Sequence, residues 1–355
     1  MMRIIQICIV FFMSALTLQT FSTANAQSAN EQLQQCWNPK LLQATRSEKY
    51  PRHGIRQAFI EPPALASYIL PPVSPALRGS IRRVELPPGQ KLIALTLDLC
   101  EAHDEVAGYD GAVIDYLRRH NIKATLFAGG KWMMTHQLRA QQLIADSRFE
   151  MGNHAWTHGN FRNINRKKMQ SEIVNAQKAY RFTINNVQRQ GCVIRSGYKL
   201  HKPEDMTLFR FPYGSCTAES LKMVGDKGLL AIQWDVATGD PSKAQSAQAI
   251  ARQVMTNVKP GSIIIAHANG RGWNTAKALP LFIPKLIAKG YKFVTVSELL
   301  AAGRPVISQH CYDSVLGDTN RYDRNRKKYK RRLRTKHRDS ITQYESIFPP
   351  HSPFR

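Results

Sequence analysis

Short apolar runs alternate with longer amphipathic stretches along the middle of this 355-residue chain. The runs are four to six residues long and rich in the side chains that suit buried strands. We therefore predict seven strands. They are expected at residues 93–97, 124–128, 148–151, 208–211, 229–234, 262–266 and 291–296.

The stretches between these runs show the three- and four-residue apolar spacing that is typical of helices. Helices are expected at residues 111–120, 131–145, 167–187, 217–227, 242–257 and 275–289. Strict alternation of strand and helix predicts parallel βα units and an α/β fold. Seven units fit an open doubly wound sheet or a barrel, and we favour the barrel because no glycine-rich phosphate turn follows the first strand.

Two segments outside this pattern have a biased composition. Seven prolines lie between Glu61 and Gly89, so we expect an extended arm there, without interior helix or central strand. Between Arg321 and Arg338, eleven of eighteen residues are Lys or Arg, and such a block is usually solvated. The expected division is a proline-rich arm at 27–90, the patterned domain at 91–302 and a basic tail at 303–355.

The N-terminus has the layout of a secretory signal. Arg3 precedes an apolar run over residues 4–16, and the triplet Ala24-Asn25-Ala26 ends the segment. A membrane anchor needs about 20 continuous apolar residues, and polar residues interrupt this run too early. We expect a signal peptide at 1–26, export to the periplasm or the medium, and no transmembrane segment after cleavage.

Export allows disulfides, and five cysteines remain after cleavage. An odd number leaves at least one thiol unpaired. Cys36 and Cys311 bracket the patterned region and could link its ends, while Cys192 and Cys216 are close enough in sequence to close a loop. The sequence alone does not fix the pairing, and simple burial of these small side chains is the alternative.

Reactive side chains follow the predicted strands. Active sites of βα folds lie at the carboxyl ends of the strands, so we expect these side chains to share one rim. They are Asp98 after the first strand, His154 and His158 after the third, Arg210 and Tyr213 at the fourth, Asp240 after the fifth and His267 after the sixth.

His154 and His158 are four residues apart, so in a helical turn both imidazoles would lie on one face and could bind one divalent metal. Such a pair is common on protein surfaces, but here it falls at the rim that also holds acidic residues and His267. Two neutral histidines with one carboxylate are a common ligand set for a catalytic zinc that keeps a position open for water.

Asp98 is the candidate base, since an acid at the end of an apolar strand is costly unless it has a partner or a function. His267 could donate a proton to a leaving amine. Arg210 could hold Asp98 through a bidentate contact, and backbone amides of the loop at Tyr213 could stabilise an oxyanion. Each residue also has a purely structural alternative. Asp98 could cap a helix or pair with Arg210, His267 could be a buried core histidine, and Arg210 could be an ordinary loop arginine.

The chain carries, in this order, Thr96-Leu97-Asp98, His154-x-x-x-His158, Arg210-x-Pro212-Tyr213, Asp240 and His267. Over about residues 91–300 this order resembles the five motifs of the NodB-like polysaccharide deacetylases, carbohydrate esterase family 4. The resemblance implies a distorted seven-stranded (β/α) barrel that removes N-acetyl groups from amino sugars with a divalent metal, usually zinc. It also implies the following roles: Asp98 the base, His154 and His158 metal ligands, His267 the acid, Arg210 the residue that holds the base, the Tyr213 amide the oxyanion donor, and Asp240 the partner of the acid.

The first motif departs from the family's pattern. The family normally has two consecutive aspartates, the second of which binds metal, and Leu99 stands at that second position. Leucine cannot bind a metal. Glu101 is our expected third ligand, with Asp104 or a water molecule as alternatives. Cys100 is a softer ligand for zinc, but an unpaired thiol without a role is our expectation for it.

The fourth motif departs as well. Ala237 replaces the usual first acid, and Pro241 replaces the tryptophan that follows Asp240 in the family. Both changes alter the expected wall beside His267.

The net charge of the chain indicates which classes of partner it could bind. The chain has 50 Lys and Arg against 25 Asp and Glu, a net charge of +25, and residues 321–338 supply +10 of it as eleven basic residues less Asp323. Tyr322 and Tyr329 among basic residues could suit nucleic acid, but export argues against that partner. Anionic lipid headgroups or acidic cell-wall polymers are expected instead, with a solvated tail that has no partner as the alternative.

Two classes of function follow from these residues. The first is a metal-dependent amidase that acts on an acetylated glycan, either peptidoglycan or an exported polysaccharide. The second is a non-catalytic glycan-binding barrel, because Leu99 removes a metal ligand. We favour the enzyme, as a monomer, because a binding module gains little from keeping both Asp98 and His267.

Overall fold

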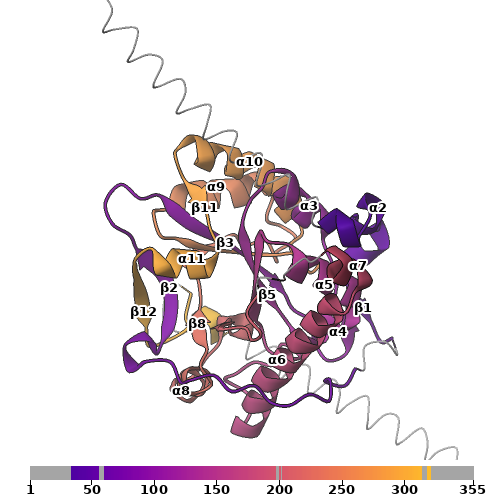
Figure 1. Ribbon diagram of the computed structural model, residues 1–355. Helices are drawn as coiled ribbons and strands as arrows, with labels where there is room; N and C mark the ends of the chain where they lie inside the picture. The colour runs from indigo at the N-terminus through magenta and orange to yellow at the C-terminus, as the bar shows by residue number, and fades with distance from the viewer. Residues whose placement is uncertain (1–32, 56–59, 197–199, 201, 314–317, 321–355) are drawn as a thin grey trace, which may run out of the picture.

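The computed structural model describes residues 33–55, 60–196, 200, 202–313 and 318–320 (Figure 1). The predicted signal at 1–26 and the Lys/Arg-rich segment at 321–338 lie outside the described residues, and both remain predictions. Among the helices of the described ranges, none has the length and apolar character that a membrane span requires.

A curled sheet forms the centre of the molecule, and helices cover its outer face (Figure 1). Along the sheet the strands follow the order β12–β2–β8–β7–β6–β5–β3–β10–β9, and β11 pairs with the start of β3. The pairing of β12 with β2 is antiparallel, and the other pairings in this order are parallel. The bounds are β2 Ser80–Glu85, β3 Leu92–Leu99, β5 Ala124–Ala128, β6 Phe149–Asn153, β7 Leu208–Phe209, β8 Leu230–Ile232, β9 Val236–Ala237, β10 Ile263–His267, β11 Lys292–Phe293 and β12 Arg304–Ser308. A small separate sheet pairs β1 (Arg52–His53) with β4 (Glu105–Val106).

Two strands from opposite ends of the strand order, β2 and β10, come close together and curl the sheet toward closure. A β-bridge joins Arg83 of β2 to Ser262, just before β10, and the Val84 amide donates to the Gly261 carbonyl at 2.9 Å. Gly261 has a φ of +85°, and a Cβ atom there would lie 1.7 Å from the Val84 carbonyl oxygen. Only glycine allows this approach. The curled sheet is thus a distorted (β/α) barrel, which confirms the predicted fold class.

Strand β3 directs its polar side chains to the inside of the barrel. Leu97 and Leu99 belong to the cluster that packs beneath the helices, whereas Asp98 contacts Arg210 in the interior. Successive side chains of a strand point to opposite faces. The next position on the inner side after Asp98 is therefore Cys100, and Leu99 faces the helices.

The predicted elements are confirmed, with shifts at their ends. All seven expected strands are present, although β11 is short because α11 begins at Val296. The expected helix at 131–145 is two helices that meet at His136, where φ is −121°. The α-helices are α2 Pro39–Leu42, α3 Gly111–Arg119, α4 Gly130–Thr135, α5 Gln137–Ala145, α6 Arg166–Gln188, α7 Gly191–Ser196, α8 Ala218–Asp226, α9 Ala247–Asn257, α10 Thr275–Ala288 and α11 Val296–Ala301.

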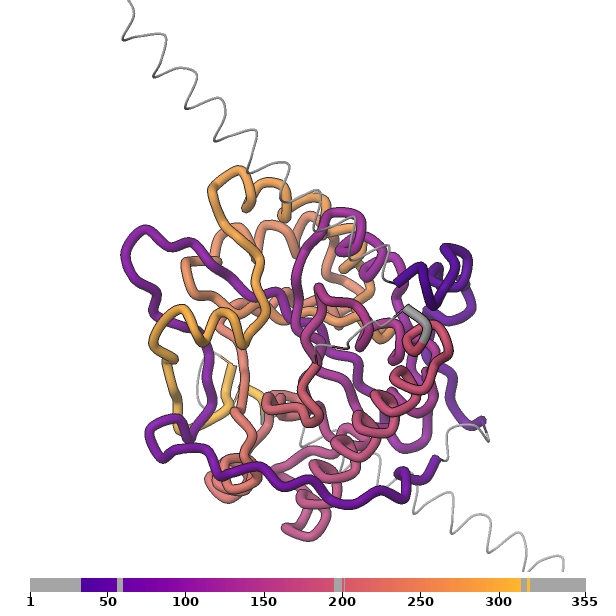
Figure 2. Tube along the Cα trace, in the orientation of Figure 1, coloured from indigo at the N-terminus to yellow at the C-terminus, as the bar shows by residue number. Residues whose placement is uncertain are grey.

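The proline-rich segment contains a strand of the main sheet, which corrects the expectation of an arm alone. Residues Ser80–Glu85 form β2, paired with β12 on one side and β8 on the other. All seven prolines lie outside these six residues, so nothing prevents full pairing. Before β2 the chain runs past α8 (Figure 2), where the Val73 amide donates to the Gly225 carbonyl at 2.8 Å.

Two disulfides join the outer segments to the barrel, Cys36–Cys192 and Cys216–Cys311. Neither pairing suggested by the sequence spacing forms. Trp37 packs in one apolar cluster with residues of α6 and α7, so the N-terminal segment lies beside α7 and not beside the C-terminal end of the domain. The loop after β7 is thereby left to pair with the segment that follows β12.

Candidate active site

Asp98 and Arg210 form a buried ion pair at the end of β3. Arg210 Nη1 lies 2.9 Å from Asp98 Oδ1 and 2.7 Å from Thr96 Oγ1. The guanidinium group also stacks 4.0 Å from the centroid of the Phe127 ring. The contact to Asp98 uses one carboxylate oxygen and is not the bidentate contact that we expected. Arg210 therefore fixes Oδ1 and leaves Oδ2 facing His154, 3.4 Å from its Nε2.

The charge of Asp98 is set by opposing effects. Burial alone would raise the pKa of this carboxyl group, but the adjacent imidazole of His154 and the Arg210 guanidinium outweigh burial and lower the pKa below its ordinary value. Asp98 is consequently a carboxylate at neutral pH. It can accept a proton from a reactant in the cavity.

His154 and His158 lie on a loop after β6 and not on the helical turn that we expected. Ala155 and His158 both have positive φ, 65° and 56°, and these two kinks bring the imidazole rings to 4.9 Å between centroids. The loop is fixed from α6, because the Glu172 carboxylate accepts hydrogen bonds from the Thr157 amide and hydroxyl, both at 2.6 Å. The two histidines are therefore neighbours, as their spacing predicted, but a kinked loop and not a helical turn brings them together.

The hydrogen bonds and pKa values of the two histidines are compatible with binding of a cation. His154 Nδ1 lies 2.9 Å from the Arg210 carbonyl oxygen and so carries the proton. His154 Nε2 is buried and has no hydrogen-bond partner, which leaves its lone pair available. Burial lowers the pKa of both imidazoles, and a neutral imidazole is the form that binds metal. A buried nitrogen without a partner next to a second imidazole fits a divalent metal ion.

Cys100 lies next to this pair. Its Sγ and the ligand nitrogens of His154 and His158 lie within 4.8 Å of one another. Among the described residues Cys100 is the one free cysteine. Asn269 Nδ2 donates to Sγ at 3.0 Å and to the Cys100 carbonyl at 2.8 Å, and burial raises the pKa of the thiol to about 12.

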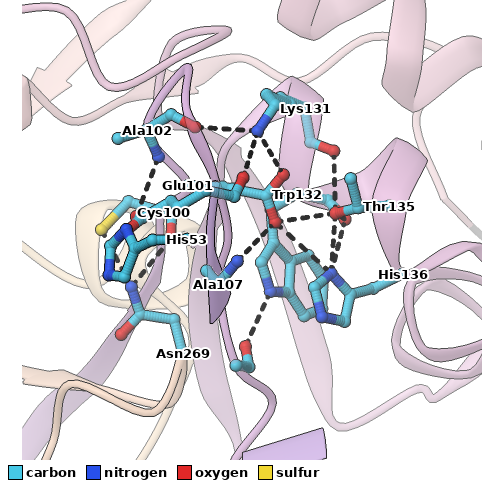
Figure 3. A network of polar contacts seen from close by, with 12 residues as sticks. His53, Cys100, Glu101, Ala102, Ala107, Lys131, Trp132, Thr135, His136 and Asn269 are labelled. Carbon is cyan, nitrogen blue, oxygen red and sulfur yellow. Dashed lines mark hydrogen bonds and ion pairs between the residues drawn. The ribbon is translucent and has the colours of Figure 1, made fainter. Parts of the chain in front are cut away.

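Glu101 does not join the two histidines, which corrects the expected ligand set. Its Oε1 lies 2.8 Å from Lys131 Nζ, with both side chains buried, and its Oε2 accepts hydrogen bonds from the Ala107 amide and the Thr135 hydroxyl at 2.8 Å each. In Figure 3 the Glu101 side chain lies among Lys131, Thr135 and Ala107, whereas Cys100 and Asn269 lie to the left. Glu101 therefore holds the start of α4 against the loop that follows β3.

His267 at the end of β10 is paired with Asp240. Its Nδ1 lies 2.9 Å from Asp240 Oδ1. Burial alone would lower the pKa of His267, but the Asp240 charge and hydrogen bond outweigh burial and raise it above its ordinary value. His267 and Asp98 are also register partners on the neighbouring strands β10 and β3. An imidazole with a raised pKa and a carboxylate with a lowered pKa therefore lie on neighbouring strands at the rim.

Tyr213 lies in the short 3₁₀ turn η4 (Pro212–Gly214) and has a φ of 61°. Its ring lies 4.3 Å from that of His158, centroid to centroid. The disulfide Cys216–Cys311 holds the end of this turn. Five of the predicted site residues line one cavity of about 440 Å³, namely Asp98, His158, Tyr213, Asp240 and His267, and Cys100 lines it too.

Comparisons with known proteins find relatives among the polysaccharide deacetylases. The family model "Polysaccharide deacetylase" matches residues 85–200, which include Asp98, His154 and His158. A peptidoglycan-N-acetylglucosamine deacetylase from Bacillus cereus is 28% identical over 194 residues, 54% of this chain and 63% of that protein. The corresponding deacetylase PgdA of Listeria monocytogenes is 28% identical over 225 residues, 63% of this chain and 42% of the relative. The chain thus spans less than two thirds of the length of these two relatives.

Solved structures agree in fold. The Bc1960 peptidoglycan N-acetylglucosamine deacetylase superposes with a TM-score of 0.52 at 25% identity, over 63% of this chain and 94% of the other. BA3943, a CE4 family pseudoenzyme from Bacillus anthracis, superposes with a TM-score of 0.51 at 26% identity, over 64% and 70% of the two chains. The family model, the curated relatives and the solved structures together support a NodB-like polysaccharide deacetylase of carbohydrate esterase family 4.

Within this family the departures in the first and fourth motifs have visible consequences. Leu99 occupies the apolar layer beneath the helices, so a ligand is missing at that position and Cys100 follows on the inner side. Ala237 and Pro241 line the cavity beside His267, where the sequence predicted an altered wall. The segment after β12 also contributes, because Asp313 and Thr319 line the same cavity.

Sequence reasoning missed three residues that support the candidate site. Asn269 holds Cys100, Glu172 fixes the histidine loop, and Asp313 accepts a hydrogen bond from Trp234 Nε1 at 2.6 Å. Asn269 stands two residues after His267 in the sequence, so it occupies the same side of the chain at the end of β10. The two-residue spacing from His267 was therefore a signal in the sequence for Asn269. No such local signal exists for Glu172 and Asp313, which are far away in the sequence from the residues they hold.

Proposed function

We propose that this protein is a metal-dependent hydrolase that removes N-acetyl groups from an amino-sugar polymer, with peptidoglycan or an exported polysaccharide as the substrate. One observation carries the proposal. Asp98 and His267, a carboxylate and a raised-pKa imidazole, are register partners that line one cavity beside His154 and His158. A base and an acid on the same small cavity suit the two proton transfers of amide hydrolysis.

Asp98 acts as the base in this proposal. A water molecule attacks the acetyl carbonyl carbon, and its proton passes to Oδ2 of Asp98, the oxygen that Arg210 does not hold. Arg210 keeps the carboxylate charged and oriented without taking part in the transfer. The backbone amide of Tyr213 is the proposed donor to the oxyanion that develops on the acetyl oxygen.

His267 acts as the acid. Its Nδ1 is held by Asp240, so Nε2 is the nitrogen that can give a proton to the sugar amine as the carbon–nitrogen bond breaks. Acetate and a free amino group are the products. Asp240 raises the pKa of His267 and so favours the protonated imidazole that a general acid needs.

His154 and His158 are the proposed protein ligands of a divalent metal, which the family resemblance implies is zinc. The ion would supply Lewis-acid activation of water and of the acetyl carbonyl group. The chain's own contribution is the orientation of the donors. The Arg210 carbonyl fixes the His154 ring, and Glu172 fixes the loop between the two histidines.

A non-catalytic glycan-binding barrel is the second candidate. Leu99 in place of a ligand favours it, as does similarity to the family pseudoenzyme from Bacillus anthracis. Against it stand Asp98 and Asp240, two buried carboxylates with dedicated partners whose retention a binding surface would not require.

Export, through the predicted signal, and attraction of the basic tail to an anionic envelope surface are also parts of the proposal. They agree with a substrate in the cell wall, because peptidoglycan lies outside the cytoplasm. Nucleic acid is not a proposed partner.

The experiment measures acetate released from chitin oligomers, peptidoglycan and poly-N-acetylglucosamine by purified protein of known metal content. We expect release from at least one of the three, and its loss in Asp98→Asn protein at equal metal content. Binding to these glycans without acetate release at any metal loading would favour the glycan-binding barrel.

A further inference from the structure

A third donor atom lies beside the two histidines. Cys100 Sγ and the nitrogens of His154 and His158 lie within 4.8 Å of one another, and within the described residues this is the one group of three donors so arranged. We propose that Cys100 is the third protein ligand of the metal, so that a thiolate takes the place of the carboxylate usual in this family. This inference rests on the proposed function for the presence of a metal, but its test does not need the activity.

Two carboxylates close to Asp98 in sequence, Glu101 and Glu105, have partners of their own. Glu101 is paired with buried Lys131 at 2.8 Å. Glu105, the first residue of β4, accepts a hydrogen bond from the Ala102 amide and pairs with Arg271. Neither belongs to the donor group around His154 and His158. Since Leu99 faces the helices, the next donor on the inner side after Asp98 is the thiol of Cys100, which directly follows β3.

The neighbours of Cys100 favour a ligating sulfur. Asn269 Nδ2 donates to both Sγ and the Cys100 carbonyl oxygen, which fixes the side chain and stabilises negative charge on sulfur. Hydrogen bonds of this kind orient and tune the ligands of protein metal sites. On the other side, the buried Nε2 of His154 lacks any hydrogen-bond partner, so a polar atom nine-tenths buried or more points into the same space.

A thiolate with two imidazoles is a softer ligand set than a carboxylate with two imidazoles. Soft sets favour Zn²⁺ and Co²⁺, whereas Mg²⁺ and Mn²⁺ prefer carboxylate and water oxygens. We therefore expect this protein to bind zinc and cobalt tightly and manganese weakly. Three protein ligands leave a fourth position open, as catalytic zinc sites require.

The test uses the full-length protein with both disulfides formed, loaded with Co²⁺. We expect visible bands of a four-coordinate site together with a near-ultraviolet sulfur-to-cobalt charge-transfer band. In Cys100→Ser protein the charge-transfer band is expected to disappear. Zinc affinity should fall by more than about 100-fold, because loss of an outer hydrogen bond alone costs roughly 10–100-fold.

Two further variants give matched comparisons. Cys100→Asp replaces sulfur with the family's carboxylate, so binding should persist without the charge-transfer band and with a shift of preference toward manganese. Asn269→Ala keeps the sulfur ligand and removes its hydrogen bond, so the band should remain while zinc affinity falls by about 10-fold. X-ray absorption of the unsubstituted zinc protein, which needs no variant to fold, should show one sulfur at about 2.3 Å.

The proposal is overturned if the cobalt protein lacks the charge-transfer band, if zinc has no sulfur neighbour, or if folded Cys100→Ser protein keeps its zinc affinity. These outcomes are separate from those of the deacetylase assay. A sulfur ligand without acetate release would overturn the proposed activity alone. Acetate release from protein whose metal has no sulfur ligand would overturn the role of Cys100 alone.

Discussion

His267 and Asp240 are joined at two points. Nδ1 of His267 lies 2.9 Å from Oδ1 of Asp240, and the His267 backbone amide donates to Oδ2 at 2.8 Å. The hydroxyls of Thr238 and Thr275 donate to the same carboxylate. Four donors thus surround one buried carboxylate, and Asp240 holds the proton of His267 on Nδ1 and fixes the direction of the ring.

This relationship predicts the pH dependence of Asp240→Asn protein. In the parent, the Asp240 charge keeps the pKa of His267 above its ordinary value despite burial, so the acid stays protonated as pH rises. Without that charge, burial acts alone and the pKa falls. The alkaline limb of kcat/KM is expected to move to lower pH by about one unit or more. Profiles of both proteins on one glycan oligomer would measure the shift, and an unmoved limb would assign the acid to another group.

The second prediction separates the base from the metal ligands. Asp98→Asn removes the proton acceptor and keeps its shape, so kcat should fall by about 100-fold or more while bound metal stays constant. The change also leaves buried Arg210 without its counter-charge, which lowers stability. Circular dichroism at the assay temperature must therefore confirm that the variant is folded. Near-parental turnover by folded protein would move the role of base away from Asp98.

The third prediction concerns Glu101 and Lys131, both buried and 2.8 Å apart. Glu101→Gln leaves an unpaired ammonium group in the interior, so the free energy of unfolding should fall by about 3–5 kcal/mol. Zinc affinity should be unchanged, because the carboxylate lies outside the donor group. Denaturant unfolding and zinc titration would measure the two effects.

An exposed ion pair provides the control for Glu101. Arg166 and Glu219 are 3.3 Å apart, and both side chains are more than half exposed. Glu219→Gln should therefore cost less than about 1 kcal/mol. If Glu101→Gln reduced zinc affinity as strongly as Cys100→Ser, the third ligand would be Glu101, as the sequence first indicated.

Local patterns were enough to predict much of this molecule. The seven runs of apolar residues became strands, and the reactive residues that follow them met at one rim because parallel strands place their carboxyl ends together. Strand β2 could not be predicted in the same way, since Ser80–Glu85 is stabilised by pairing with β8 and β12, about 150 and 220 residues later in the chain. The disulfides depend on the same long-range packing.

The third donor illustrates where sequence reasoning stopped. Glu101 carries the charge that a metal ligand needs, and only its distant partner Lys131 shows that the charge is already neutralised. Strand alternation places Cys100 on the same side as Asp98, a signal that a choice of ligand by residue type alone leaves out. The histidine pair was identified from its spacing although the helix assumed for it is absent, because Ala155 and His158 adopt positive φ.

The last prediction concerns the basic segment at 321–338, which lies outside the described residues. Thr319 lines the cavity, so the chain should be shortened after Asn320 and not earlier. Turnover on a short chitin oligomer should then be nearly unchanged, because every proposed catalytic group is retained. Residues 321–355 hold twelve Lys and Arg against three Asp and Glu, and the loss of these nine net positive charges should instead weaken binding to vesicles rich in anionic phospholipid.

Salt provides the control for this last comparison. Near 0.5 M salt the Debye length is only a few ångströms, roughly 4 Å, so binding of the full-length protein to the vesicles should approach that of the shortened protein. A binding difference that persists at this salt concentration would require contacts other than charge. Loss of turnover on the short oligomer at every salt concentration would mean that residues after Asn320 support the barrel itself, and the solvated-tail prediction would be wrong.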